Sequence, residues 1–149
     1  MTRVRILLAC ALLVLLVAFP AAQAEASPTL DMIAKINDLR HSHGLRTLQV
    51  SPSLMHSAHR YSGVMMARQY FGHASRIQAS AKYKRLGEII EIHRGSRVGV
   101  SRAFTDWLHS PEHLGVMLDP SFTYIGGGYT SGRFQGSTNT LWVVHFGKL

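Results

Sequence analysis

Apolar positions recur with a helical period after two Ser-Pro pairs in the first half of the chain. The residues after Pro28 that fall on one helical face are Met32, Ile33, Ile36 and Leu39. The corresponding residues after Pro52 are Leu54, Ala58, Tyr61 and Met65. Serine favours the N-cap because it accepts a hydrogen bond from a free amide, and proline at the first helical position loses no bond. The pattern predicts one helix from Pro28 to a stop near Gly44, and a second from Pro52 to about Gln69.

The period changes after a polar, basic loop at residues 74–85. In the sequence GEIIEIH, residues 87–93, successive side chains point to opposite sides, so that Glu91 shares a side with Ile89. This alternation predicts a strand. A third helix is expected next, capped by Ser96. Its apolar stripe comprises Val100, Phe104, Trp107 and Leu108.

A short fourth helix is expected between the pairs Ser110-Pro111 and Asp119-Pro120. Two strand patterns, residues 122–130 and 140–148, then end the sequence, with the turn-rich segment 131–139 between them. The glycines of the first pattern are expected to allow close packing against that strand. This order of elements predicts an α+β fold in which one small antiparallel sheet packs against helices.

The first residues of the chain are typical of a secretory signal peptide rather than of a folded element. Two arginines precede a continuous apolar run, residues 6–19, and small residues follow it. We expect a signal peptide of residues 1–24, with cleavage after Ala24 or else after Ala26, and a mature domain of residues 25–149. The apolar run is shorter than the ~20 residues that a membrane span needs. An uncleaved anchor is the alternative.

Composition adds two constraints. The one cysteine, Cys10, lies in the apolar run, so the mature domain must be stabilised by its core without disulfides. The formal net charge is +8, and removal of the signal peptide lowers it by two. This balance favours anionic partners such as cell-wall polymers or acidic lipid head groups, and secretion argues against nucleic acid. Only the sequence KYKR, residues 82–85, is a basic cluster, so solubility with a loose surface affinity is the simpler interpretation.

Two histidines four positions apart, His109 and His113, first suggest a metal pair on one helix face. Pro111 argues against that geometry, because the residue before a proline is pushed out of the helical region. The two histidines should then lie on different helices, and the sequence is not H-E-x-x-H. We expect His109 to be an exposed residue at a helix end, and His113 to lie in the first turn of a new helix, where it can point into a groove.

Four segments, in this order, resemble the CAP superfamily of cysteine-rich secretory proteins, antigen 5 and pathogenesis-related proteins, and its bacterial secreted branch most of all. They are YFGHAS, LGEII, AFTDWLHSPEHLGVMLDPSFTYIGGGY and LWVVHFG. The resemblance extends from Leu30 to Gly147, nearly the whole mature chain. It implies an α-β-α sandwich with a small antiparallel sheet between helices, and a central cleft that holds two histidines and acidic residues.

The resemblance also implies which residues form the cleft. His73 matches the first histidine, Glu88 the glutamate of the Gly-Glu motif, and His113 the second histidine. Ser110 stands where many eukaryotic members have a second glutamate, so the acidic set is incomplete. Strand alternation fixes the face on which His145 lies, and from that face it could approach the cleft. We take Ser110 and His145 as supporting residues.

The chemistry of this set leaves three interpretations open. Two imidazoles and a carboxylate suit zinc better than calcium, so Zn is the expected cofactor if the cleft binds a metal reversibly. Alternatively the residues form a metal-free His–Glu–His network, or Glu88 orients a histidine without touching a metal. The third interpretation is a catalytic site, but the sequence has no nucleophile motif such as G-x-S-x-G. The sequence therefore assigns no catalytic residue and does not decide whether the protein is an enzyme.

We expect a monomeric protein, secreted to the extracellular space or cell envelope, that acts as a binding module for a cell-wall polymer, a lipid or a sterol. Apolar side chains before His73 are expected to line a groove or the core: Met65, Met66, Tyr70 and Phe71. The alternative is a metal-dependent hydrolase of peptide or cell-wall bonds, with Glu88 as general base. A third possibility is an envelope protein that works through its basic surface. The sequence names neither ligand nor biological process.

Overall fold

The computed structural model describes residues 27–149. The predicted signal peptide of residues 1–24 and the two predicted cleavage sites lie outside the described residues, and so does Cys10. Within residues 27–149, no helix combines the length and the apolar character that a membrane crossing requires.

Helices and strands follow one another in the order α1, β1, α2, β2, α3, α4, β3, β4. The helices are α1 (Pro28–Ser42), α2 (Pro52–Arg68), α3 (Val100–Leu108) and α4 (Pro111–Met117). The strands are β1 (Gln49–Val50), β2 (Arg85–Arg94), β3 (Tyr124–Phe134) and β4 (Ser137–Lys148). They form one sheet with the order β1-β3-β4-β2, in which β3, β4 and β2 are antiparallel neighbours. The two-residue edge strand β1, which the sequence pattern did not predict, pairs parallel to β3.

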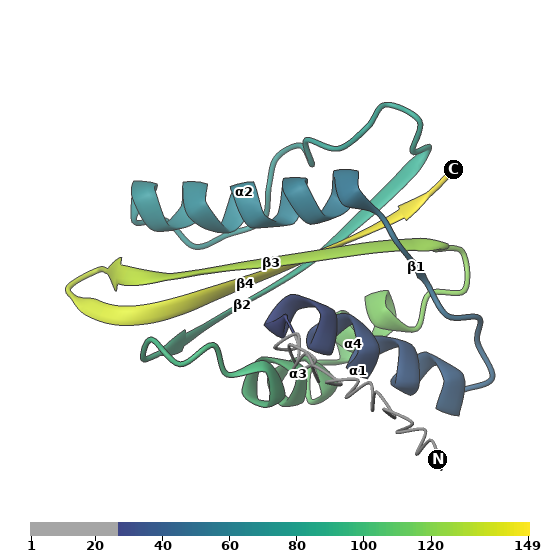
Figure 1. The fold of residues 1–149 in the computed structure, drawn as a ribbon, viewed down its shortest axis with the longest axis horizontal. Coiled ribbons are helices and arrows are strands. Elements are labelled where there is room, and N and C mark those ends of the chain that lie inside the picture. The colour runs from purple at the N-terminus through teal and green to yellow at the C-terminus, as the bar shows by residue number, and fades with distance from the viewer. Residues whose placement is uncertain (1–26) are drawn as a thin grey trace, which may run out of the picture.

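The sheet lies between two layers of helices, so the predicted α+β fold with α-β-α layers is confirmed. Figure 1 shows α2 on one side of the sheet and α1, α3 and α4 together on the other. One core cluster joins the sheet to the three-helix layer around Trp107 and Trp142, and a smaller one joins it to α2 around Met65 and Leu141. Residues of β2 divide between the clusters as alternation predicts, because Ile89 belongs to the first and Ile90 to the second.

Three helices begin at the predicted Ser-Pro pairs, but only one serine side chain caps its helix. Ser51 accepts a hydrogen bond from the Leu54 amide at 3.4 Å, whereas Ser27 and Ser110 occupy the N-cap position without a side-chain bond. Proline at the first helical position is therefore the more constant of the two start signals.

The predicted capping of α3 by Ser96 is wrong. The N-cap is Gly99, in the left-handed region at φ +57°, and the helix begins at Val100. The His93 ring explains the delay, because its Nε2 lies 3.1 Å from the Arg97 carbonyl oxygen and holds the preceding residues in a turn. A Cβ on Gly99 would also lie 2.6 Å from the same nitrogen, so this turn has room only for glycine.

The predicted nine-residue turn at 131–139 is a two-residue turn instead. Strands β3 and β4 stay paired as far as Phe134 and Ser137, and only Gln135 and Gly136 connect them. Both have positive φ, +45° and +86°, as a tight hairpin with the twist of its strands requires. The polar residues of this segment misled the pattern, although Phe134 packs in the core cluster under α2 and Asn139 is buried.

The glycines of β3 do allow close packing, as expected. A Cβ on Gly128 would lie 2.3 Å from the Cα of His59, and a Cβ on Gly126 would lie 2.2 Å from the backbone nitrogen of Met55. The backbone of α2 therefore lies directly against β3, and this close approach sets the distance between α2 and the sheet.

Candidate functional site

Glu88 lies at the centre of a hydrogen-bonded cluster on the edge strand β2. Its side chain is 5% exposed. Oε1 accepts from the Nδ1 of His73 at 2.9 Å and from the backbone amide of Ala74 at 2.8 Å, and Oε2 accepts from the Nε2 of His145 at 2.8 Å. The structure thus brings together the predicted residues Glu88 and His73 and the predicted supporting residue His145.

Strand register places His145 at this cluster. Glu88 of β2 pairs with His145 of the neighbouring strand β4, and side chains of directly paired residues project to the same face. On this face both residues lie on the side covered by α2. His73 reaches the cluster from the loop that follows α2, where the bond from Ala74 fixes the loop backbone as well.

The donors around Glu88 hold it in its ionised form. Burial by itself would raise the pKa of Glu88, but hydrogen bonds from His145, the Ala74 amide and His73, together with the charge of His145, bring that pKa below its ordinary value. Glu88 is therefore a carboxylate at neutral pH, able only to accept hydrogen bonds.

This carboxylate fixes which imidazole nitrogens carry protons. His73 must donate through Nδ1, so in its neutral form it presents the lone pair of Nε2 outwards. His145 must donate through Nε2, and its Nδ1 is enclosed without a hydrogen-bond partner among the described residues. The side chain of His73 is 61% exposed and that of His145 1%. His73 is therefore the member of the cluster that a ligand can reach.

His113 lies near this cluster but is not bonded to it. Burial lowers its pKa, and the nearby His73 lowers it further, against the opposite effect of Glu112. Its Nδ1 is enclosed and has no hydrogen-bond partner in the part of the chain that the structure describes. As the sequence predicted, α3 ends before Pro111 and His109 is an exposed helix-end residue, whose Nδ1 bonds the Thr105 carbonyl oxygen at 2.8 Å.

Ser110, the other predicted supporting residue, lies at the N-cap of α4. No hydrogen bond joins its hydroxyl to Glu88 or to any of the three histidines. The structure therefore brings His145, and not Ser110, into the cluster.

The cluster does not fit zinc as a site with three protein ligands. Within the described range 27–149, no group of three or more His, Cys, Asp or Glu side chains is arranged to hold a metal ion. Both oxygens of Glu88 are already engaged, so the carboxylate orients His73 from behind instead of coordinating. The imidazoles of His73 and His113 are the two groups that would hold a metal, and zinc stays a prediction.

A groove of about 340 Å³ begins at His73 and runs along α2; we call it the His73 groove. Apolar and aromatic side chains contribute one part of its lining: Tyr61, Val64, Met65 and Tyr70. Arginines contribute another: Arg60, Arg68 and Arg76. Of the four side chains expected to line a groove or the core, Tyr70 lines this groove, and Met65 lines it while buried in the core. Met66 packs against the core cluster under α2, whereas Phe71 is exposed and does not line the groove.

Sequence reasoning missed the groove arginines and a second acid–imidazole pair. Arg60 and Arg68 are two helical turns apart on α2 and flank Val64, a spacing that a search for basic residues on one helix face would have found. The missed pair is Glu91 and His93, both buried, with the Nδ1 of His93 2.9 Å from Oε2 of Glu91. No local pattern distinguishes this pair from an ordinary strand face.

Comparisons with known proteins agree with the geometry. A family model described as the cysteine-rich secretory protein family, CAP, matches residues 33–146. The protein YkwD of Bacillus subtilis is 30% identical in an alignment of 119 residues that covers 74% of this chain and 43% of YkwD. The chain thus spans less than half the length of this curated relative.

Solved structures show the same fold at low identity. An outer surface protein of Borrelia burgdorferi superposes with a TM-score of 0.64 at 20% identity, over 80% of this chain and 90% of that one. An extracellular protein of Bacillus anthracis that contains an SCP domain gives a TM-score of 0.66 at 20% identity, over 82% of this chain and 40% of that one. Both are proteins of the cell exterior by description, and the likeness extends to the fold.

Proposed function

Because this chain belongs to the CAP family of cysteine-rich secretory proteins, we propose that it is a secreted extracellular module that binds an anionic, partly apolar component of the cell envelope in the His73 groove. An envelope lipid is the first candidate, and a wall polymer the second. The observation that carries the proposal is the lining of the groove, which combines apolar side chains with three arginines beside an exposed histidine.

The lining matches an amphiphile with a negative head group. Arg60, Arg68 and Arg76 supply donors for a phosphate or carboxylate group, and arginine suits such groups because its planar fork can bind two oxygens at once. Val64 and Tyr70, which lie among these arginines and are at least partly exposed, offer contact to a hydrocarbon part.

The Glu88 cluster supports this role by shaping the groove. The bonds from His73 and Ala74 to one carboxylate oxygen tie the loop after α2 to the edge of the sheet. His73 and Ala74 both line the groove, so Glu88 fixes one of its walls without contacting the ligand. His73 presents Nε2 from that wall, where it can accept a hydrogen bond or hold a metal ion.

The same contacts favour binding over hydrolysis. A general base must be free to take a proton, whereas Glu88 accepts three hydrogen bonds and its pKa lies below the ordinary value. A carboxylate of this kind is better suited to orient a histidine than to activate water.

Vesicle binding tests the proposal. We expect the purified protein to float with phosphatidylglycerol vesicles and not with phosphatidylcholine vesicles, and Arg60→Gln/Arg68→Gln to lose roughly tenfold or more in affinity at low salt, since each cation near an anionic surface contributes about 1 kcal/mol. The matched control is Arg94→Gln/Arg97→Gln, which removes the same charge from exposed positions outside the groove.

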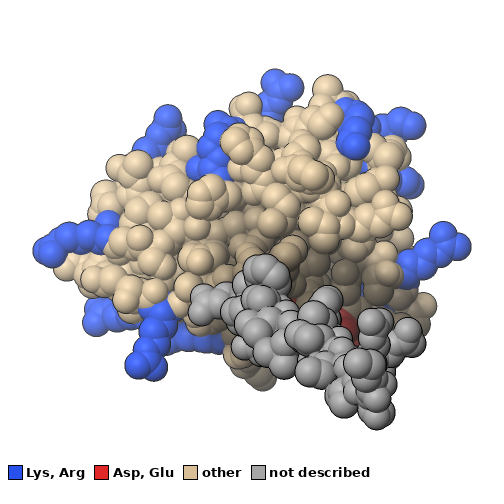
Figure 2. Space-filling model, in the orientation of Figure 1, with Lys and Arg blue, Asp and Glu red and all other residues tan. Residues whose placement is uncertain are grey.

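Two other results of the vesicle assay would assign binding to another surface or to another ligand. Equal losses in the two double variants would mean that the basic surface as a whole binds, and basic side chains are indeed spread around the face in Figure 2. Binding to purified cell wall but not to vesicles, with the same dependence on Arg60 and Arg68, would favour a wall polymer as the ligand.

Calorimetric titration with zinc tests the predicted cofactor. Heat of binding near neutral pH that disappears in both His73→Ala and His113→Ala would assign the metal to these two imidazoles, and no heat with the unmodified protein would rule zinc out. His109→Ala is the control, since His109 lies on an exposed helix end and bonds a carbonyl oxygen of its own helix. An unchanged titration in His73→Ala would overturn the metal assignment.

A further inference from the structure

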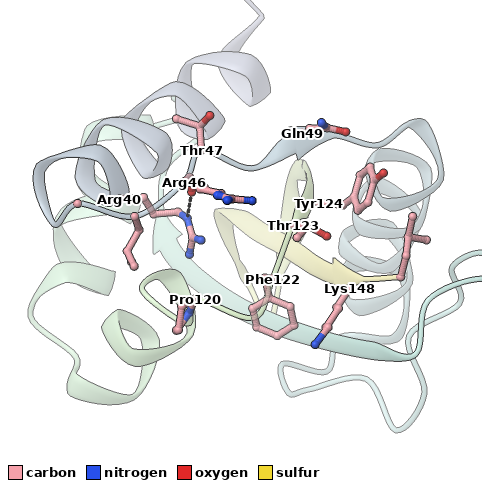
Figure 3. A pocket seen from close by; sticks show the side chains of 12 residues that line it. Arg40, Arg46, Thr47, Gln49, Pro120, Phe122, Thr123, Tyr124 and Lys148 are labelled. Atoms are coloured by element: carbon pink, nitrogen blue, oxygen red, sulfur yellow. Dashed lines mark hydrogen bonds between the residues drawn. The ribbon is translucent and has the colours of Figure 1, made fainter.

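A second hollow, of about 660 Å³, lies at the end of the sheet where β1 and β3 begin and β4 ends. Figure 3 shows the side chains around it, which come from the end of α1, the α1–β1 and α4–β3 connections, the starts of β1 and β3 and the end of β4. It shares no residue with the His73 groove. Its size is that of a small-molecule site, for which roughly 300–1,000 Å³ is usual.

A buried guanidinium group forms part of the wall of this hollow. Arg40 is 1% exposed, yet its side chain binds only carbonyl oxygens: Nε donates to Arg46 at 3.0 Å, and Nη1 donates to Met117 at 2.7 Å and to Asp119 at 3.0 Å. The Nη2 group makes no hydrogen bond within residues 27–149. Arg40 lines the hollow with only 1% of its surface exposed, so it adds positive charge to the wall from a buried position.

No carboxylate within the described part of the chain neutralises Arg40. The nearby acidic side chain, Asp119, pairs with Arg85 at 2.7 Å and accepts from the Ser121 amide at 2.8 Å. Burial lowers the pKa of Arg40, and Asp119 opposes that effect from a distance. A guanidinium group stays protonated even so, which leaves one buried positive charge without a contacting anion.

Two further cations lie on the rim. Arg46 and Lys148 are exposed and line the same hollow, and the backbone of Arg46 is held in place by the bond from Arg40. Three positive groups, two from the end of α1 and the connection after it and one from the end of β4, therefore line one space, and such a set favours charge-assisted hydrogen bonds to a phosphate group.

The rest of the wall combines polar residues, Thr47, Gln49 and Thr123, with apolar and aromatic ones. Phe122 is almost fully buried at the base of the hollow, and Tyr124 stands half-buried beside it. Phe122 already packs against Phe146, and Tyr124 packs against Tyr83. The exposed part of the Tyr124 ring is therefore the apolar surface that an ester, unlike an inorganic anion, would cover.

We propose that this hollow binds a phosphate ester: the phosphate group pairs with the exposed cations Arg46 and Lys148, next to the buried charge of Arg40, and the organic part packs on Tyr124. The ester comes either from a free small molecule or from a lipid head group.

Phenyl phosphate is the probe for a free ester, followed by amide chemical shifts in NMR. We expect saturable shifts at Arg46, Thr47 and Thr123, and an affinity roughly tenfold above that for inorganic phosphate, because one ring adds apolar contact. Arg46→Gln/Lys148→Gln should weaken binding about tenfold or more. Arg40 is left unchanged, because its bonds to Met117 and Asp119 hold α1 to the end of α4.

Vesicles of phosphatidic acid in phosphatidylcholine are the probe for a lipid source. Binding of phenyl phosphate, or of these vesicles, that Arg46→Gln/Lys148→Gln weakens and the surface control Arg94→Gln/Arg97→Gln does not supports the site, and the probe that binds identifies the source. Equal losses in both variants, equal affinity for inorganic phosphate and phenyl phosphate, or no saturable binding to either probe would overturn it.

Discussion

At the scale of single residues, the same side chain behaves in opposite ways at two positions of β2. Glu88 and Glu91 are three residues apart and therefore lie on opposite faces of the strand. Glu88 has three N–H donors, one of them a backbone amide, whereas both oxygens of Glu91 share one donor, the Nδ1 of His93. Burial raises the pKa of Glu91 despite His93, and the nearby Asp106 raises it further, while the pKa of Glu88 is lowered.

Substitution of Glu88 should therefore destabilise the fold in a pH-dependent manner. We expect Glu88→Gln to lower the free energy of unfolding at pH 7 by about 1–3 kcal/mol, since the bonds to a buried charged acceptor are weakened or lost. Because the folded-state pKa is depressed, the contribution of Glu88 is present above its unfolded-state pKa and disappears as the pH falls through the folded-state value. Urea unfolding across that acidic range measures it.

Two matched variants check this prediction. Glu91→Gln should cost less than Glu88→Gln at pH 7, because the raised pKa of Glu91 means that the fold prefers its neutral form. Glu112→Gln, at an exposed position on α4, should change the free energy of unfolding by less than about 0.5 kcal/mol. If Glu88→Gln were no more destabilising than Glu112→Gln, the cluster would have no structural role.

At the scale of elements, the contact between α2 and β3 positions the His73 groove. The glycines at 126 and 128 let the α2 backbone approach the strand, and Ser62 of α2 bonds Thr130 of β3 at 2.8 Å on the same side. The loop that carries His73 starts where α2 ends, so the depth of α2 on the sheet sets where that loop can meet Glu88.

Addition of one methyl group at this contact should disturb both stability and the site. We expect Gly128→Ala to destabilise by about 1–3 kcal/mol or more, because the new Cβ meets backbone atoms of His59 that only a movement of the whole helix can clear. The amide of Ala74 should then exchange with solvent faster than in the unmodified protein. Urea unfolding and hydrogen exchange measure the two effects.

Gly132 is the control position on the same strand. A Cβ there would lie 3.4 Å or more from the side chain of Met66, which is ordinary contact. Gly132→Ala should therefore be close to neutral, within about 0.5 kcal/mol. If the two variants lost the same free energy of unfolding, the close approach of α2 would not be the reason why β3 needs its glycines.

At the scale of the whole molecule, both helical layers pack against the same sheet. No disulfide within the chain joins the two layers, since the chain has a single cysteine. Trp142 and Val143 are neighbours on β4, yet they belong to the two different core clusters. Loss of one helical layer would expose the face of the sheet that this layer covers. The remaining layer would then rest on a half-exposed sheet, so neither layer is expected to persist alone.

The domain should consequently unfold in one cooperative step. Trp107 and Trp142 both belong to the cluster under α1 and α3, so their fluorescence reports on that layer, whereas far-UV circular dichroism includes α2. We expect the two signals to give the same urea midpoint. A fluorescence transition that precedes or follows the loss of helix would mean that the layers unfold separately.

The sequence by itself determined most of the elements, although not β1, the start of α3 or the length of the last hairpin, and it proposed the residues of the candidate site. Helix starts followed from Ser-Pro pairs, strand faces from alternation, and the separation of His109 from His113 from the proline between them. These features are local, because they depend on backbone sterics and on residues within one or two turns. The resemblance to the CAP family named His73, Glu88 and His113 from short motifs, and the family match confirms that membership.

Only the tertiary structure decided which of these groups touch one another. The register of β2 against β4 sets Glu88 beside His145, the loop after α2 brings in His73 and leaves His113 unbonded, and Arg40 reaches a hollow that β1, β3 and β4 complete. Such contacts join residues dozens of positions apart, and their geometry depends on how the whole core packs. Periodicity fixes the face on which a side chain lies, but only that packing fixes its partner.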